Sequence, residues 1–413
     1  MYWLFICSTL FDIYEPRATG ATYSSPDGLW TLKLAIIGFV DDTRNSTRAV
    51  CDFEDLLRIS QNDCQLWNDI LNTSNQALEL PKCGYHIIHQ DFKPSGEPVL
   101  QTAIEADITL KDSNGRDISM TQWPADKAVK YLGVYKCPDN QSQQAQVLQK
   151  QCDEFARVLC TSNLNRAETQ TMYWAIFHPS VGYALPTCYF PQHQLTKIQR
   201  KAHRAMVSNS GFNRNTSSDV LFGPHYLGGA GFMHLYDVQG YGQVKLFLKF
   251  WRTPDSIPDK LLRITMAWAQ KCAGISTPIL QDPTTKLPHL PSQWLKSLRT
   301  YLSDTQSSIT LQEAPIPTLQ RDRDCFLMDL ALTLGYRPGD LRRLNYCRLY
   351  LNVTLLSDIT TVTGTTILHQ AYIGELLEDP VLEDSVTQQR PDNSSWRIWK
   401  NFLNKISQYP THT

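Results

Sequence analysis

The sequence predicts an α+β fold in which antiparallel strands and helices come first and a mainly helical part follows. Two observations support this prediction. Short apolar segments separated by turn residues alternate with helical periodicity over residues 1–135, and helical periodicity predominates afterwards. The 413 residues, 42% of them hydrophobic and 19% charged, are enough for two or three domains with sizeable cores.

The first part is expected to alternate between helices and strands. Residues 1–14 predict a helix, because their apolar side chains fall on roughly one face. An apolar strand over residues 32–40 then ends in Asp41 and Asp42, and turn residues follow. The further elements expected are a strand after this turn, a helix over 53–77, and strands over 78–88, 107–110 and 128–135.

Helices are expected to predominate from residue 141 onward. Residues 141–159 and 172–189 carry apolar residues at helical spacing. Residues 254–291 are rich in proline and predict a loop, whereas residues 318–375 predict helices followed by a polar tail. The expected parts are therefore 1–135, 136–260 and 261–413.

The net charge of −1 gives no overall electrostatic signal for nucleic acid, so such binding needs a local patch. Residues 192–252 supply one, since they hold eight Lys or Arg against two Asp. The eight are Lys197, Arg200, Lys201, Arg204, Arg214, Lys245, Lys249 and Arg252. Such a surplus favours salt-sensitive, sequence-independent contacts with phosphates. The alternative is a solvated pair of amphipathic helices.

The lack of signal-peptide features and the cysteine usage favour a nuclear or cytoplasmic protein without a membrane segment. The apolar start lacks a basic n-region and a small-residue cleavage site, and it is shorter than the about 20 residues that span a bilayer. Eleven cysteines without paired spacing are typical of free thiols in a reducing compartment. Cys83, His86 and His89 have a zinc-like spacing but no second ligand pair, so buried strand residues are the preferred interpretation.

Asp41 and Asp42 are the most informative pair of residues. Two carboxylates at the end of an apolar strand repel each other unless a cation neutralises them. A hairpin tip that holds divalent metal ions is therefore one interpretation, and polymerases use metals held in this way. The other interpretation is an ordinary acidic turn between two strands.

Three segments in order give the acidic pair a context. Phe39-Val40-Asp41-Asp42, Leu80-Pro81-Lys82-Cys83 and Tyr131-Leu132-Gly133 resemble the metal-binding box, the following lysine box and the primer-grip hairpin of a reverse transcriptase palm. The resemblance is closest to polymerases of non-long-terminal-repeat (LINE-type) retrotransposons. Residues 228–232 and 344–351 resemble segments that follow the polymerase in such elements.

The resemblance implies an RNA-directed DNA polymerase with an RNA template and a DNA primer as partners. Residues 1–135 would form the C-terminal half of the palm, 136–260 a thumb-like helical region and 261–413 a helical region of uncertain role. Asp41 would ligate Mg²⁺ with support from Asp42, and Lys82 would neutralise the triphosphate or donate a proton. The nucleic-acid-binding residues would be Tyr131, Leu132 and Gly133 at the primer end and Lys197, Arg200, Lys201 and Arg204 in the thumb.

One departure from the family changes the expected activity. The family's first metal-binding aspartate has no counterpart, since Asp12 lies in the expected helix and Asp27 in a turn. We therefore expect an N-terminally truncated polymerase with weak or absent Mg²⁺ binding and negligible activity on its own. The alternatives are a non-enzymatic nucleic-acid-binding remnant or interaction protein that keeps the palm–thumb shell, and a structural fragment without function.

Overall fold

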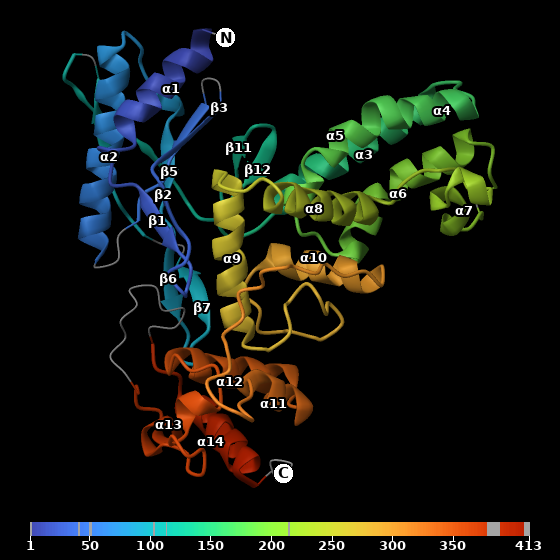
Figure 1. The fold of residues 1–413 in the computed structure, drawn as a ribbon. Helices are drawn as coiled ribbons and strands as arrows, with labels where there is room; N and C mark the ends of the chain where they lie inside the picture. The colour runs from blue at the N-terminus through green and yellow to red at the C-terminus, as the bar shows by residue number, and fades with distance from the viewer. Residues whose placement is uncertain are drawn as a thin grey trace.

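The computed structural model describes residues 2–39, 42–48, 52–101, 104–112, 114–213, 215–377 and 389–408. Strands and helices alternate up to residue 136 and helices predominate afterwards, which confirms the mixed α+β class. Figure 1 shows a strand region (residues 2–136), a helical arm (residues 142–251) and the C-terminal helices (residues 293–408) arranged around one central helix, α9.

The strand region consists of short strands with two longer helices. The helices α1 (Tyr2–Tyr14) and α2 (Phe53–Thr73) confirm two of the predicted helices. The strands are β1 (Ala21–Ser24), β2 (Thr31–Leu34), β3 (Ile36–Phe39), β4 (Asp42–Asn45), β5 (Gly84–His86), β6 (His89–Phe92), β7 (Pro98–Gln101), β8 (Thr109–Lys111), β9 (Asp117–Ser119), β10 (Thr121–Trp123), β11 (Val129–Tyr131) and β12 (Val134–Lys136). Among the described residues they form six separate two-stranded sheets, and β5 pairs with β10 in parallel, whereas antiparallel strands were expected.

Two predicted strands differ in the structure. The strand expected over 78–88 begins only at Gly84, because residues Leu80–Lys82 form a 3-10 turn (η1) with Pro81 in its first turn. The strand expected over 128–135 is a hairpin, β11–β12, which turns at Leu132 and Gly133. Both turn residues have positive φ, 48° and 82°, as a two-residue turn with the twist of its strands requires.

Asp63 fixes the segment after α1 onto α2. This residue is 3% exposed, and its two carboxylate oxygens accept hydrogen bonds from the backbone N–H groups of Thr19 and Gly20, both at 2.8 Å. The hydroxyl of Tyr14 donates to the backbone oxygen of Asp63 at 3.1 Å. Together with the nearby core around Trp67, these bonds set the position from which β1 and β2 start.

We expect Asp63→Asn to lower the free energy of unfolding by about 2 kcal/mol, since an amide accepts through one oxygen only and its NH₂ group then faces a backbone N–H. Urea denaturation followed by circular dichroism measures this change. Asp69→Asn on the same helix is the control, because the exposed carboxylate of Asp69 accepts a hydrogen bond from the side-chain amide of Gln65 and from no other described side chain. Equal losses in the two variants would contradict the role given to Asp63.

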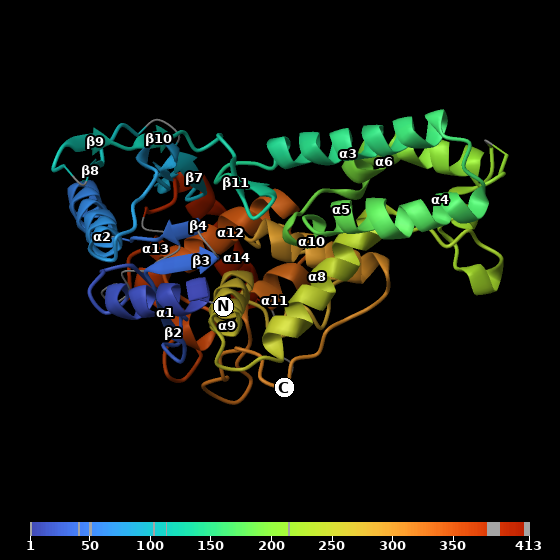
Figure 2. The ribbon, with the colours of Figure 1, turned by 90° about the horizontal axis from the view of Figure 1, so that it is seen from above.

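The helical arm confirms the helices that the apolar periodicity predicts. It contains α3 (Ser142–Thr161), α4 (Arg166–Met172), the π-helical turn η2 (Tyr173–Phe177), α5 (His178–Gly182), η3 (Leu185–Thr187), α6 (Gln192–Asn209), α7 (Ser218–Phe222), η4 (His225–Leu227) and α8 (Leu235–Trp251). Figure 2 shows the arm extending away from the strand region with α3 and α6 side by side. The side-chain amide of Gln149 donates to the backbone oxygen of Ile198, and that of Asn209 donates to the backbone oxygen of Leu159. The earlier residues of both helices are thus paired with each other, and so are the later ones, so the two helices run parallel. Stacked rings of Phe155 and Phe177, 4.2 Å apart, lie in the core between them and α5.

The loop predicted for 254–291 is wrong in its first half, where α9 (Ile257–Ala273) forms a regular helix. The hydroxyl of Ser256 accepts a hydrogen bond from the backbone N–H of Asp259 at 3.2 Å and thereby caps the helix. Pro258 stands in the first turn, where a missing N–H removes no helical hydrogen bond. Gly274 ends the helix with φ 65°.

The C-terminal helices share one core with residues of α8 and α9. They are α10 (Gln293–Asp304), α11 (Leu327–Thr333), α12 (Pro338–Tyr350), the turn η5 (Ser357–Ile359), α13 (His369–Ile373) and α14 (Asn393–Gln408). The expected polar tail is therefore wrong for α14. Trp396, Trp399, Phe402 and Leu403 lie at helical spacing on one face of α14 and are buried in this core.

Candidate nucleic-acid interface

The strands on either side of the acidic pair form the hairpin that the sequence predicts. β3 and β4 are antiparallel with Phe39 opposite Asp42 and Gly38 opposite Thr43. Asp42 is the first residue of β4, and Asp41 lies outside the described residues. A side chain at Gly38 would collide with the ring of Phe11, so α1 packs directly on this hairpin. The strands beside the acidic pair are thus confirmed, while metal binding by Asp41 and Asp42 stays a prediction.

Lys82 lies on the exposed 3-10 turn and not on a strand. Its ammonium nitrogen is 2.6 Å from Oε2 of Glu79, and both side chains are largely exposed. This hydrogen bond raises the pKa of Lys82 above its usual value. Exposed ion pairs at this spacing are weak, so an anionic ligand can displace Glu79 readily.

The hairpin with Tyr131, Leu132 and Gly133 is attached to the helical arm. The backbone N–H of Tyr135 donates to Oε1 of Gln144 on α3 at 2.8 Å. The ammonium group of Lys136 donates to the backbone oxygen of Thr187 at 2.7 Å, and burial lowers the pKa of this lysine. These bonds fix the hairpin at the amino-terminal end of α3, which is also the end where α6 begins.

Four cations form one exposed stripe along α6. Lys197, Arg200, Lys201 and Arg204 follow the spacing i, i+3, i+4, i+7 that places side chains on one helical face, and all four are exposed. The residues Leu195, Ile198, Ala202 and Ala205 occupy the opposite, buried face. The stripe spans about 10 Å along the helix. We call these four residues the α6 stripe.

The charges of the α6 stripe are only partly neutralised. Lys201 lies 3.0 Å from Oδ2 of Asp153 on α3. Within the part of the chain that the structure describes, no carboxylate oxygen lies within 4.0 Å of a side-chain nitrogen of Lys197, Arg200 or Arg204, the limit for an ion pair. Three guanidinium or ammonium groups therefore remain available to phosphates.

A shallow groove of about 420 Å³ runs between α3 and α6 beside the stripe. Its lining residues are Asp153, Ala156, Arg157, Cys160, Lys201, Arg204, Ala205 and Ser208. Arg157 is not among the residues predicted from the sequence, and its guanidinium group is paired with the carboxylate of Glu154 at 2.6 and 2.9 Å. The contact between α3 and α6 brings it there, and a single sequence shows no sign of that pairing. The groove thus adds a third cation beside Lys201 and Arg204.

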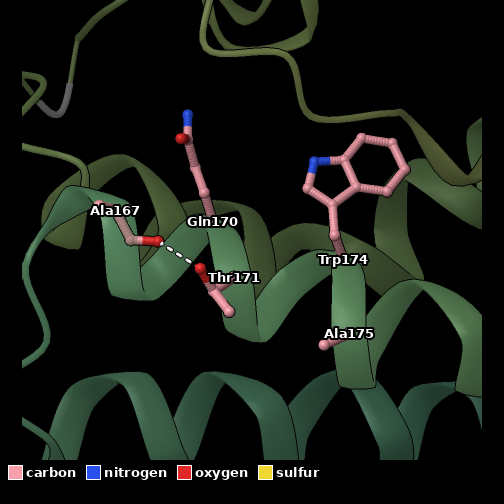
Figure 3. Close-up of a pocket in the computed structure, with 5 residues that line it drawn as sticks. All are labelled: Ala167, Gln170, Thr171, Trp174 and Ala175. Carbon is pink, nitrogen blue, oxygen red and sulfur yellow. Dashed lines mark hydrogen bonds between the residues drawn. The ribbon is translucent and has the colours of Figure 1, made fainter.

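A larger depression of about 550 Å³ lies elsewhere on the arm, where α4 meets η2 (Figure 3). It is lined by Ala167, Gln170, Thr171, Trp174 and Ala175. The hydroxyl of Thr171 donates to the backbone oxygen of Ala167 at 3.0 Å. The side-chain amide of Gln170 donates to the backbone oxygen of Ala230, also at 3.0 Å. No charged side chain lines this depression, so it lacks the lysine and arginine groups that neutralise phosphates in the α6 stripe.

The described ranges contain neither a cluster of metal-ligating residues nor a helix that could span a membrane. No three His, Cys, Asp or Glu residues there lie close enough together to hold a metal ion. His86, which belongs to the zinc-like spacing, packs against Trp123 with 5.4 Å between the two ring centroids. No described helix is long and apolar enough to cross a membrane. No protein-family model, curated protein or solved structure matches this chain.

Proposed function

We propose that this chain is a reverse-transcriptase-like protein of retroelement origin that binds a primer–template duplex through the α6 stripe. The strand region then corresponds to part of the palm and the helical arm to the thumb. The α6 stripe carries the proposal, because three of its four charged groups lack a described carboxylate partner and all four point outward. The order of the Asp41–Asp42 hairpin, the Leu132–Gly133 turn and the helical arm supports the assignment.

The stripe favours contacts with the nucleic-acid backbone. Lysine and arginine neutralise phosphates and release counterions, so the affinity falls as salt rises and depends little on base sequence. The stripe begins at Lys197, near the end of the arm that holds the Leu132–Gly133 turn. A duplex bound along α6 would therefore lead toward this hairpin, where Tyr131, Leu132 and Gly133 would hold the primer end.

The chemical step would belong to the β3–β4 hairpin. There Asp41 would ligate Mg²⁺ with Asp42 beside it, and Lys82 would exchange its contact with Glu79 for the triphosphate. Mg²⁺ keeps most of its waters and binds weakly where only two adjacent carboxylates serve it. We therefore propose that the chain by itself binds nucleic acid without extending a primer.

Primer extension on an RNA template with Mg²⁺ tests this proposal for the chemical step. We expect no incorporation by the wild-type chain, by Asp41→Ala or by Asp42→Ala, while duplex binding persists in all three. Incorporation by the wild type that either substitution abolishes would contradict the non-catalytic assignment and show a complete metal site. A duplex affinity that salt does not change would argue against phosphate contacts through the α6 stripe.

A further inference from the structure

Arg263 on α9 lies between two tryptophan rings from different parts of the molecule. Its guanidinium carbon is 4.9 Å from the ring centroid of Trp30 and 4.5 Å from that of Trp251. Trp30 belongs to the strand region, just before β2, and Trp251 ends α8 of the helical arm. Figure 1 shows α9 between these two parts. One side chain thus joins the strand region, the central helix and the helical arm.

A buried carboxylate orients the guanidinium group of Arg263. Its Nε donates to both carboxylate oxygens of Asp259, at 2.9 and 3.0 Å, and the Asp259 side chain is 1% exposed. The Arg263 side chain is itself only 14% exposed. The ion pair fills an edge of the planar group and leaves its faces to the rings. Cation–π contacts strengthen when they are shielded from water, as here.

A second contact attaches the same strands to α9. The indole nitrogen of Trp268 donates to the backbone oxygen of Ser24 at 2.7 Å. Ser24 ends β1, and the backbone N–H of Ser25 donates to the backbone oxygen of Trp30 at 2.8 Å. The β1–β2 hairpin is therefore held at both sides of its turn. β3 follows β2 after one residue, so the hairpin that leads to Asp42 is positioned from the same anchor.

We propose that Arg263, stacked between Trp30 and Trp251, is a clamp that holds the strand region and the helical arm in one fixed arrangement. The part of this inference that concerns ligands rests on the proposed function. Under that function the clamp sets the distance between the β3–β4 hairpin and the α6 stripe, so that both contact one duplex. Arg263 is then a positioning residue without contact to the duplex.

Hydrogen exchange measured by mass spectrometry tests the clamp without any ligand. Trp30→Leu removes one ring and leaves the Asp259–Arg263 pair intact. We expect exchange in residues 21–34 to rise about tenfold while α3 stays protected. Arg263→Lys keeps a cation beside Asp259 but loses the planar stack, and we expect the same local rise. Trp174→Leu is the matched control, because Trp174 is an exposed tryptophan outside the clamp.

Unchanged exchange in residues 21–34 of Trp30→Leu, or an equal rise in Trp174→Leu, would overturn the clamp. Duplex affinity is the second readout. If both parts contact one duplex, Trp30→Leu weakens binding about tenfold through the lost second contact, whereas Trp174→Leu does not. A wild type that binds no duplex would refute the proposed function, and the exchange result would still decide on the clamp.

Discussion

Replacing Arg348 with Met is expected to lower the free energy of unfolding by about 4 kcal/mol. Arg348 is fully buried on α12, and its guanidinium group donates to Oδ1 of Asn345 at 2.8 and 3.0 Å. It also donates to the backbone oxygens of Lys271 at 2.7 Å, Cys272 at 3.1 Å and Val353 at 3.0 Å. Methionine fills much of the volume but leaves these oxygens without donors.

The location of these oxygens explains the size of the effect. Lys271 and Cys272 lie in the last turn of α9, where helical carbonyl groups lack intrahelical partners and attract positive charge. Arg348 therefore ties the end of α9 to the C-terminal helices, as Arg263 ties its first half to the strand region. Burial lowers the pKa of Arg348 to about 10, so the group stays charged at neutral pH.

Guanidinium chloride denaturation of Arg348→Met and Arg343→Met measures this contribution. Arg343 is an exposed residue of the same helix and bonds only the hydroxyl of Ser394 among its described partners, at 3.3 Å. We expect its replacement to change stability by less than about 0.5 kcal/mol. Similar losses in both variants would contradict the anchoring role of Arg348.

The largest expected effect on binding comes from the α6 stripe. The double variant Lys197→Gln, Arg204→Gln should bind an RNA–DNA duplex about tenfold more weakly at moderate salt, because two phosphate contacts are lost. The slope of log affinity against log salt concentration should become shallower by about 2. Fluorescence anisotropy with a labelled duplex at several salt concentrations measures both quantities.

A matched pair on α8 separates a specific face from net charge. Lys245→Gln, Lys249→Gln removes the same number of charges from two exposed residues one helical turn apart. We expect this variant to bind nearly as well as the wild type. If both double variants lose the same affinity, the binding depends on overall charge and the assignment to α6 is wrong.

Local patterns explain which elements the sequence could predict. The helices α2, α3 and α6 show their apolar stripes within one segment, and the four cations of the α6 stripe follow from helical spacing alone. The loop prediction over α9 failed because it was based on the proline content of 254–291, although proline such as Pro258 is favourable in a first turn that Ser256 caps. The prediction of a continuous strand over 128–135 failed because the β11–β12 turn has positive φ at Leu132, a backbone conformation that leucine rarely adopts.

The contacts that arrange these elements could not be predicted in this way. Trp268 and Ser24 are 244 residues apart in sequence, and no local pattern of residue types marks such a pair. The same holds for Arg348 and the carbonyl groups that end α9, and for Arg157 beside the α6 stripe. Each contact depends on how elements distant in sequence pack together, and the sequence of a single chain does not show that packing.

Wild-type binding of an RNA–DNA duplex across a series of salt concentrations tests the central claim most directly. Three or four phosphate contacts from the α6 stripe predict that log affinity falls linearly with log salt concentration, with a slope of about −3. Absence of binding at low salt would contradict the assignment of this chain as a nucleic-acid-binding protein, and an affinity that salt does not change would contradict phosphate contacts through the α6 stripe.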